Sequence, residues 1–158
     1  MKSNYFLSLS LEEQNKLLES ILDALPYVVF LYDVEERKNL FINNAVFENI
    51  GYTIEEIHSL GDKVLQEIIH PDDYEEIIDL FQKNIVSKED STHIHLNRWK
   101  DKQGKYHWFK NHVTPFYKSK LNNSNKVILT MSNNITPQVT SQSMILKQIK
   151  NVEKISFT

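Results

Sequence analysis

The sequence predicts an α+β domain, in which helices cover one face of an antiparallel sheet. Strand-like stretches form two groups, at 27–33 and 40–43 and then at 92–96, 106–117 and 126–132, with helical stretches between the groups. The loop at 101–104 predicts a hairpin, because Asp101 can accept hydrogen bonds from nearby amides and Gly104 can adopt a positive φ. Strand pairs on both sides of a helical segment favour helices on one face of the sheet.

The composition limits the possible functions to a few classes. The 158 residues suffice for one domain with extensions, and the net charge of −3 comes without a basic block, so we expect no nucleic acid partner. The chain has no cysteine, which excludes disulfides and thiolate chemistry. No stretch approaches the roughly 20 apolar residues of a membrane span, and the N-terminus lacks a secretory signal. We therefore expect a cytoplasmic domain without membrane contact.

Residues 1–24 are expected to form a flanking helix outside the compact unit. Ser8 or Ser10 can cap this helix, and Pro26 stops it. Apolar residues recur at helical spacing along it, namely Leu11, Leu18, Ile21, Leu22 and Leu25. This stripe either packs on the outer face of the sheet or meets the same helix of a second chain, which would make the protein a homodimer.

Short helices are expected after the first two strands. A helix from Asn43 or Asn44 should end at Gly51, which suits a left-handed C-terminal cap. Thr53 should cap the next helical turn, and a weaker helix is expected over 62–69.

The longest internal helix is expected to begin at Pro71 and to end near Val86. Proline suits a first helical turn, and Asp72 and Asp73 complement the helix dipole there, which we prefer to an acid–base role. An apolar stripe marks this helix as the lid over the sheet, and it consists of Tyr74, Ile77, Ile78, Phe81 and Ile85.

Residues 137–158 are expected to form a C-terminal linker or signalling helix. Ile145, Ile149 and Val152 make a narrow apolar seam along it. The seam is consistent with the start of a coiled coil that leads to an output domain, or with an amphipathic helix that folds back on the same domain.

A series of short sequence words resembles the PAS domain, over about Leu22 to Thr136. The words are Leu25-Pro26, Asn43-Asn44-Ala45, Gly51-Tyr52-Thr53 with Glu55-Glu56, His70-Pro71-Asp72-Asp73, Lys100-Asp101-Lys102-Gln103-Gly104 before Tyr106-His107-Trp108, Val113-Thr114-Pro115 and Asn134-Ile135-Thr136. These words are similar to those of the PAS branch that is found in bacterial sensor proteins. Asn134 stands where the family usually has the Asp that ties the last strand to the signalling helix.

The resemblance implies a PAS fold at 25–136, with a five-stranded sheet in the order 2-1-5-4-3. It also implies a sensory module that binds a small ligand or dimerises, and that relays a signal to an output domain such as a histidine kinase. The alternative is a ligand-free module for protein–protein interaction or dimerisation. The sequence contains no nucleophile–base set and no phosphate-binding loop, so we do not expect an enzyme.

A ligand pocket would be lined by inward residues of the sheet and the lid. The candidates are Phe30, Ile42, Asn43, Phe47, Ile78, Phe81, Ile94, Leu96, Arg98, Tyr106, Leu129 and Met131. The alternative is that the apolar members fill the core. Asn43, Arg98 and Tyr106 could offer donors to a ligand, although we prefer an ion pair between Arg98 and an acidic residue across the sheet.

No cofactor is expected. Flavin adducts need a cysteine, whereas noncovalent flavin stays possible because Trp99 and Trp108 could stack on its rings, in place of ordinary packing. Haem also stays possible, but it needs an axial ligand, and residues 74–86 contain no histidine. His70 is interpreted as a turn residue.

The strand histidines do not predict a metal site. His93 and His95 share a face, but no carboxylate or cysteine accompanies them at the spacing of metal ligands. We therefore expect exposed histidines.

Overall fold

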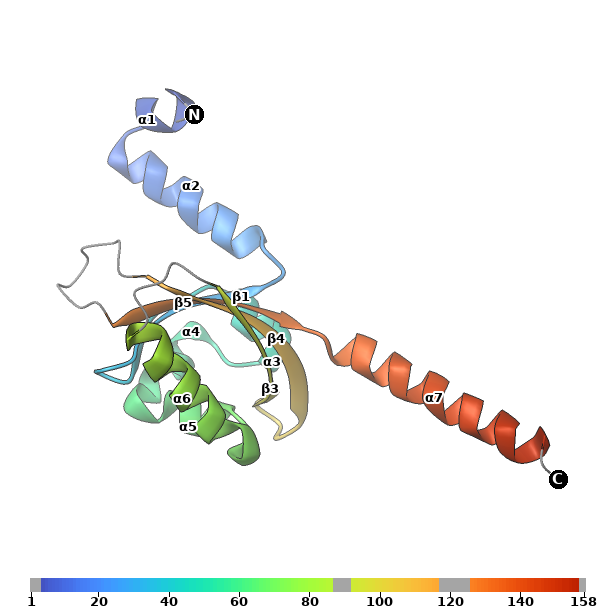
Figure 1. Cartoon of the computed structure of the whole chain (residues 1–158). Coiled ribbons are helices and arrows are strands. Elements are labelled where there is room, and N and C mark those ends of the chain that lie inside the picture. Colours follow the sequence, from blue (N-terminus) through green and yellow to red (C-terminus); the bar gives the residue numbers. More distant parts are fainter. Residues whose placement is uncertain (1–3, 87–91, 117–125, 157–158) are drawn as a thin grey trace.

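The structure, a computed structural model, describes residues 4–86, 92–116 and 126–156. Its centre is a five-stranded sheet in the order β2-β1-β5-β4-β3 (Figure 1), in which all neighbouring strands are antiparallel. The strands are β1 (Val28–Asp33), β2 (Lys38–Ile42), β3 (His93–Lys100), β4 (Tyr106–Pro115) and β5 (Val127–Asn134). The predicted fold class and strand order are confirmed.

Helices cover one face of the sheet and extend from both ends of the domain (Figure 1). The covering layer consists of α3 (Ala45–Ile50), α4 (Ile54–Ser59), the short 3-10 helix η1 (Gly61–Lys63), α5 (Val64–Ile68) and α6 (Pro71–Val86). The flanking helices are α1 (Asn4–Ser8), α2 (Leu11–Ala24) and α7 (Thr136–Ser156). None of the described helices combines the length and apolar character needed to cross a bilayer.

Capping residues place the helix ends where the sequence predicts them. The Ser10 hydroxyl accepts a bond from the Glu13 N–H, and the Glu13 carboxylate accepts one from the Ser10 N–H, so α2 begins with a capping box. Thr53 and Glu56 repeat this arrangement at α4. Gly51 follows α3 with a φ of 80°, which is the predicted left-handed cap.

The β3–β4 hairpin closes on Asp101 and Gly104 as predicted. Asp101 Oδ1 accepts bonds from the N–H groups of Gln103 and Lys105, both at 2.9 Å, and Gly104 has a φ of 89°. The other carboxylate oxygen lies 2.8 Å from His107 Nε2, and this hydrogen bond lowers the pKa of Asp101. The turn therefore fixes the register between β3 and β4.

The core lies between the inner face of the sheet and the helical layer. Trp99 stacks on Phe109 with ring centroids 4.2 Å apart, and its ring lies 5.9 Å from that of Phe30. From α6, Ile77 and Phe81 are buried against this cluster, which confirms the predicted lid. The side chain of Ile85, also assigned to that stripe, lies outside the described residues.

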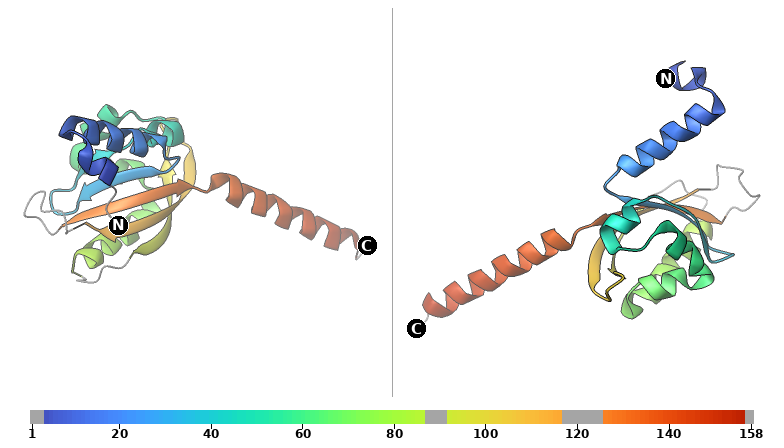
Figure 2. Two further views of the ribbon diagram at one scale, coloured as in Figure 1. Left: turned by 90° about the horizontal axis from the view of Figure 1, so that it is seen from above. Right: turned by 180° about the vertical axis from the view of Figure 1, so that it is seen from behind.

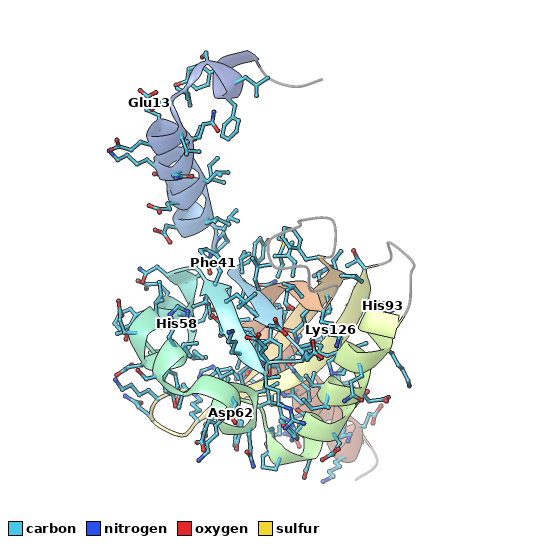
Figure 3. The ribbon with its side chains drawn as sticks, turned by 90° about the vertical axis from the view of Figure 1, so that its left-hand side faces the viewer. Glu13, Phe41, His58, Asp62, His93 and Lys126 are labelled. Atoms are coloured by element: carbon cyan, nitrogen blue, oxygen red, sulfur yellow. The ribbon has the colours of Figure 1, made fainter. Side chains whose placement is uncertain are left out.

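The flanking helices project from the domain in different directions (Figures 1 and 2). No residue of α2 is buried, and the helix stands away from the sheet and its covering helices except at its C-terminal end, where Leu22 and Asp23 accept hydrogen bonds from Asn43 and Asn44 (Figure 3). In α7, the residues at 141–154 are all exposed. The alternative in which the C-terminal helix folds back on the domain is therefore wrong, because Ile145, Ile149 and Val152 of its apolar seam are 50–62% exposed.

Candidate ligand-binding cavity

A cavity of about 50 Å³ lies between the inner face of the sheet and the helices α3–α6. The helices contribute apolar side chains, and β3, β4 and β5 contribute most of the polar ones. The lining consists of Phe30, Tyr32, Asn39, Ile42, Val46, Ile50, Ile57, Val64, Leu65, Ile68, Ile69, Ile77, Phe81, His95, Asn97, Trp99, Asn111, Val113 and Thr130. An apolar cavity with a few convergent polar groups is the usual form of a small-molecule site.

A chain of hydrogen bonds crosses the polar wall of the cavity from β5 to β3. The Ser132 hydroxyl donates to Asn111 Oδ1 at 2.6 Å, and Asn111 Nδ2 donates to Asn97 Oδ1 at 2.7 Å. The indole N–H of Trp99 donates to the same Asn97 oxygen at 2.9 Å. These bonds hold the two amide side chains in fixed orientations within the wall.

Two buried polar atoms beside this chain have no hydrogen-bond partner among the described residues. They are Thr130 Oγ1 and His95 Nε2, and both residues line the cavity. Thr130 is 1% exposed. Natural proteins leave few buried polar atoms unpaired, because each one costs about 1–3 kcal/mol. Thr130 and His95 therefore keep hydrogen-bonding capacity that no described residue uses.

The buried nitrogen of His95 corrects the expectation of exposed strand histidines. His93 is exposed as predicted, but the next inward position brings the His95 ring to the cavity. Among the described residues, no group of side chains could hold a metal ion.

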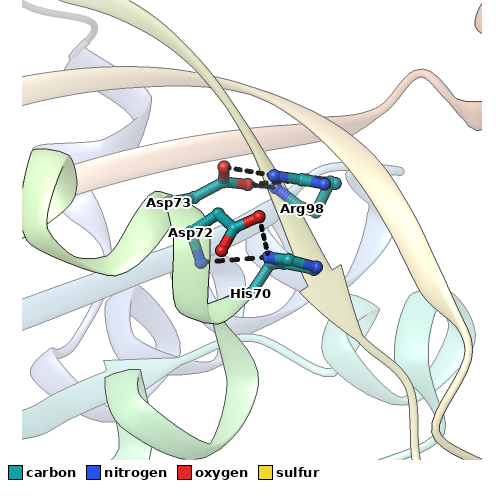
Figure 4. A network of polar contacts seen from close by, with 4 residues as sticks. All are labelled: His70, Asp72, Asp73 and Arg98. Atoms are coloured by element: carbon teal, nitrogen blue, oxygen red, sulfur yellow. Dashed lines mark hydrogen bonds and ion pairs between the residues drawn. The ribbon is translucent and has the colours of Figure 1, made fainter.

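An ion pair ties α6 to β3, the edge strand of the sheet (Figure 4). The Asp73 carboxylate accepts bonds from Arg98 Nε at 2.9 Å and from Arg98 Nη2 at 2.7 Å, and also from the Arg98 backbone N–H. The Arg98 side chain thereby lowers the pKa of Asp73. Arg98 forms an ion pair as expected, but the expectation of a partner across the sheet is wrong, because Asp73 belongs to α6. Asp73 therefore does more than complement the helix dipole.

His70 and Tyr106 lie beside this ion pair and outside the cavity lining. His70 Nδ1 accepts a bond from the Asp72 N–H at 3.1 Å, as expected of a turn residue, and its ring lies 4.5 Å from that of Tyr106. The His70 N–H donates to the Arg98 carbonyl, so the start of α6 continues the hydrogen bonding of the sheet edge. Tyr106 was predicted as a donor to a ligand, and this placement corrects that prediction.

Asn43 is buried but serves the backbone. Its Oδ1 accepts from the Val29 N–H at 2.9 Å, and its Nδ2 donates to the carbonyls of Leu22 and Tyr27. Both amide hydrogens are used, so Asn43 has no donor left for a ligand. It connects the end of α2 to β1 instead.

The predicted apolar pocket residues divide between the cavity and the outer surface. Phe30, Ile42 and Phe81 line the cavity. Ile78 is partly buried and packs against the core without lining the cavity. The remaining candidates, which the structure places outside the lining, are Phe47, Ile94, Leu96, Leu129 and Met131.

The strand candidates were wrong because their side chains point to the opposite face. Successive side chains on a strand alternate between the two faces of a sheet. On β3 the inward positions belong to His95, Asn97 and Trp99, so Ile94 and Leu96 point outward and are 61% and 52% exposed. The same alternation on β5 turns Leu129 and Met131 away from the cavity. Phe47 is exposed because the inward face of α3 belongs to Val46 and Ile50.

The residues present do not fit a flavin or a haem. The cavity has room for only a few water-sized atoms, since one water needs about 10–15 Å³ of such space. Trp99 already stacks on Phe109, and the Arg98 guanidinium lies 5.2 Å from the ring centroid of Trp108, so each indole already has a packing partner. His95 supplies a nitrogen that could ligate iron, but a macrocycle has no space beside it.

Hydrogen bonds connect the end of the sheet to α7. The Trp108 N–H donates to Thr136 Oγ1 at 2.9 Å, and the Ile135 N–H donates to the Trp108 carbonyl at 2.8 Å. Asn134 Oδ1 accepts from the Thr136 N–H at 3.1 Å. Asn134 is neutral, but its side chain still forms a hydrogen bond with the start of α7.

Comparisons with known proteins identify the fold. A family model described as the PAS fold matches residues 39–131. No curated protein matches the chain. The solved PAS domain of an HTR-like protein from Haloarcula marismortui is 17% identical with a TM-score of 0.62, and the alignment covers 79% of this chain and 94% of that one.

Two further solved structures extend the comparison to signalling proteins. A sensory box histidine kinase/response regulator from Burkholderia thailandensis is 13% identical with a TM-score of 0.59, over 89% of this chain and 98% of that one. An RNA-binding light-oxygen-voltage receptor is 15% identical with a TM-score of 0.66, over 96% of this chain and 40% of that one. At these identities the likeness shows a shared fold.

Proposed function

The chain belongs to the PAS-fold family, and from this premise we propose that it is a sensory signalling module. In this proposal, a small molecule binds in the cavity between the sheet and α3–α6, and the resulting change passes to an output domain through α7. The observation that carries the proposal is the cavity itself, with the unpaired atoms Thr130 Oγ1 and His95 Nε2 in its wall.

The connection from Trp108 to Thr136 supplies the route to the output. β4 contributes Asn111 and Val113 to the cavity wall, and the same strand holds the first turn of α7 through Trp108. A molecule that binds two arrangements of this strand unequally would shift the position of α7.

A histidine kinase is the proposed class of output domain, because the similar Burkholderia thailandensis structure is described as one. RNA binding is a property of the light-oxygen-voltage receptor. The net charge of −3 gives no reason to extend it to this chain. We propose no catalytic activity for the chain and no resident cofactor, since the cavity is small and its described lining holds no nucleophile–base pair.

Xenon under pressure tests whether the cavity accepts a molecule. Xenon is apolar and enters dry protein cavities. The amide signals of the lining residues in a ¹⁵N NMR spectrum of the full chain should shift with xenon pressure. Val113→Phe should abolish these shifts by filling the cavity, with Val113→Leu as a smaller replacement in case Phe disturbs the fold.

His112→Phe is the matched control, because its side chain points to the opposite face of β4. It should leave xenon binding intact. Shifts that are absent in the wild-type chain, or that persist in both Val113 variants, would refute the proposed ligand site.

A dimerisation module is the second candidate function, and the exposed apolar stripe of α2 favours it. Leu11, Leu18 and Ile21 are 46–74% exposed in the single chain, although a stable helix usually buries its apolar face. The same helix of a second chain would bury this stripe, which would make the protein a homodimer.

Light scattering on the full chain tests the dimer. The wild-type chain should have the mass of two copies, and Leu18→Glu should reduce it to one. Ser20→Glu adds the same charge on a different face of α2 and should leave the dimer intact. A wild-type monomer at all concentrations would exclude this candidate.

A further inference from the structure

The two walls of the cavity differ in chemistry. Residues of α3–α6 that face it are all apolar, whereas Asn97, Asn111, His95 and Thr130 from the sheet are polar. A molecule bound there would place its apolar part against the helices and its polar part against β3–β5.

Most polar side chains of the sheet wall bond to one another, so only part of their hydrogen-bonding capacity is left for a ligand. The bonds Ser132–Asn111, Asn111–Asn97 and Trp99–Asn97 are made within the protein. Thr130 Oγ1 and His95 Nε2 are buried without a partner among the described residues. A hydroxyl both donates and accepts, and an imidazole nitrogen does either according to its tautomer, so together they suit a group such as a hydroxyl or a carbonyl.

Thr130 and His95 stand on the same inner face of the sheet, in adjacent rows. Thr130 on β5 is opposite Val113 on β4, and His95 on β3 is opposite Asn111 on β4, two residues away from Val113. The residues thus flank the same stretch of β4 from its two sides, and both side chains project from the wall toward the helices.

The charge of the lining selects against ions. Among the residues that the structure describes, no Asp, Glu, Lys or Arg lines the cavity. Asp73 and Arg98 pair with each other at the edge of β3. An unpaired ion would lose its hydration on entering an apolar cavity, whereas a neutral molecule would lose little.

We propose that this cavity recognises a small, neutral, mainly apolar molecule with one hydroxyl or carbonyl group, which bonds to Thr130 Oγ1 and His95 Nε2. The inference rests on the proposed function, since it names the class of ligand for the same site. A short-chain alcohol or ketone has this chemistry and a size near that of the cavity.

NMR titration of the full chain with 2-butanol tests the proposal, with xenon as the apolar reference and butyrate as the charged one. 2-Butanol should bind at the lining residues. Thr130→Val preserves the shape of the side chain and should weaken 2-butanol binding by about fivefold to tenfold, the value of one hydrogen bond, with xenon binding unchanged. His95→Leu should act in the same direction and gives a second, independent variant.

The outcomes separate this inference from the proposed function. Xenon binding without 2-butanol binding, or equal 2-butanol affinity in the wild type and in both variants, would refute the recognition by Thr130 and His95 and leave the cavity as a ligand site. Butyrate binding as tight as that of 2-butanol would refute the neutral class. Failure of xenon to bind would refute both.

Discussion

Thr130→Val and Ser132→Ala form a matched pair of changes on one strand. Both hydroxyls lie on the inner face of β5, and the two residues are 1% and 0% exposed. The Ser132 hydroxyl donates to Asn111 Oδ1 at 2.6 Å, whereas the Thr130 hydroxyl has no partner among the described residues. The two variants therefore remove a paired and an unpaired buried hydroxyl from neighbouring inward positions.

Their effects on the free energy of unfolding should have opposite signs. Ser132→Ala leaves Asn111 Oδ1 without a donor, which should cost about 1–3 kcal/mol. Thr130→Val removes an unpaired polar group and keeps the branched shape, so it should stabilise the ligand-free chain by about 1 kcal/mol or more. For a chain of this length 1 kcal/mol corresponds to about 2–4 °C, so the two Tm values should differ by about 4 °C or more.

Urea and thermal denaturation followed by circular dichroism measure both effects. The full chain is first unfolded and refolded, so that any bound molecule is released. Adding 2-butanol should then raise the Tm of the wild type more than that of Thr130→Val, because a ligand stabilises the state that it binds. A loss of stability in Thr130→Val as large as that in Ser132→Ala would refute the reasoning, since it would show that the Thr130 hydroxyl already has a partner.

Three further predictions follow from individual residues. The Arg98 side chain lowers the pKa of Asp73 below its ordinary value of 3.8, so the ion pair stabilises the fold above that value and its contribution is lost as the pH falls through the lower native pKa. The difference in unfolding free energy between the wild type and Asp73→Asn should therefore shrink on acidification. A difference that does not depend on pH would contradict the ion pair. Burial raises the pKa of Tyr32 to about 12, so the free energy of unfolding should decline once the pH exceeds the ordinary pKa of 10. Tyr32→Phe should reduce this decline in alkaline denaturation. An alkaline denaturation curve that is the same in the variant and the wild type would contradict the buried hydroxyl. Gly51 has a φ of 80°, so Gly51→Ala should lower the unfolding free energy by about 1–2 kcal/mol in urea denaturation, and an equally stable variant would contradict the left-handed cap.

The order of the elements was predictable from local signals. Ser10, Thr53, Pro71 and Gly51 act within one turn of the chain, so their effects can be recognised without knowledge of the partners across the fold. Arg98 was also correctly expected to form an ion pair, but its partner on α6 required the tertiary structure.

The face of each strand was less predictable. Ile94 and Leu96 were expected to point inward because apolar residues usually face the core. In this sheet the inner face carries the polar chain of Asn97, Asn111 and Ser132, and the outer face carries exposed apolar residues. On β3, hydrophobic alternation therefore indicates the wrong face.

One signal in the sequence could have found the polar wall. On β3, Trp99 shares its face with His95 and Asn97, and a large aromatic residue near the hairpin is a better marker of the core than Ile94. The lack of a partner for Thr130, by contrast, depends on which side chains from other elements fail to reach it. No pattern within β5 indicates that.

Hydrogen exchange at the start of α7 tests the central claim most directly. The measured quantities are the exchange rates of the Thr136 and Val139 amides, of which the latter donates to the Ile135 carbonyl, in the full chain with and without 2-butanol. If cavity and output are coupled, 2-butanol should change these rates in the wild type and leave them unchanged in Val113→Phe. Altered exchange at the cavity lining together with unaltered rates at Thr136 and Val139 would contradict the account.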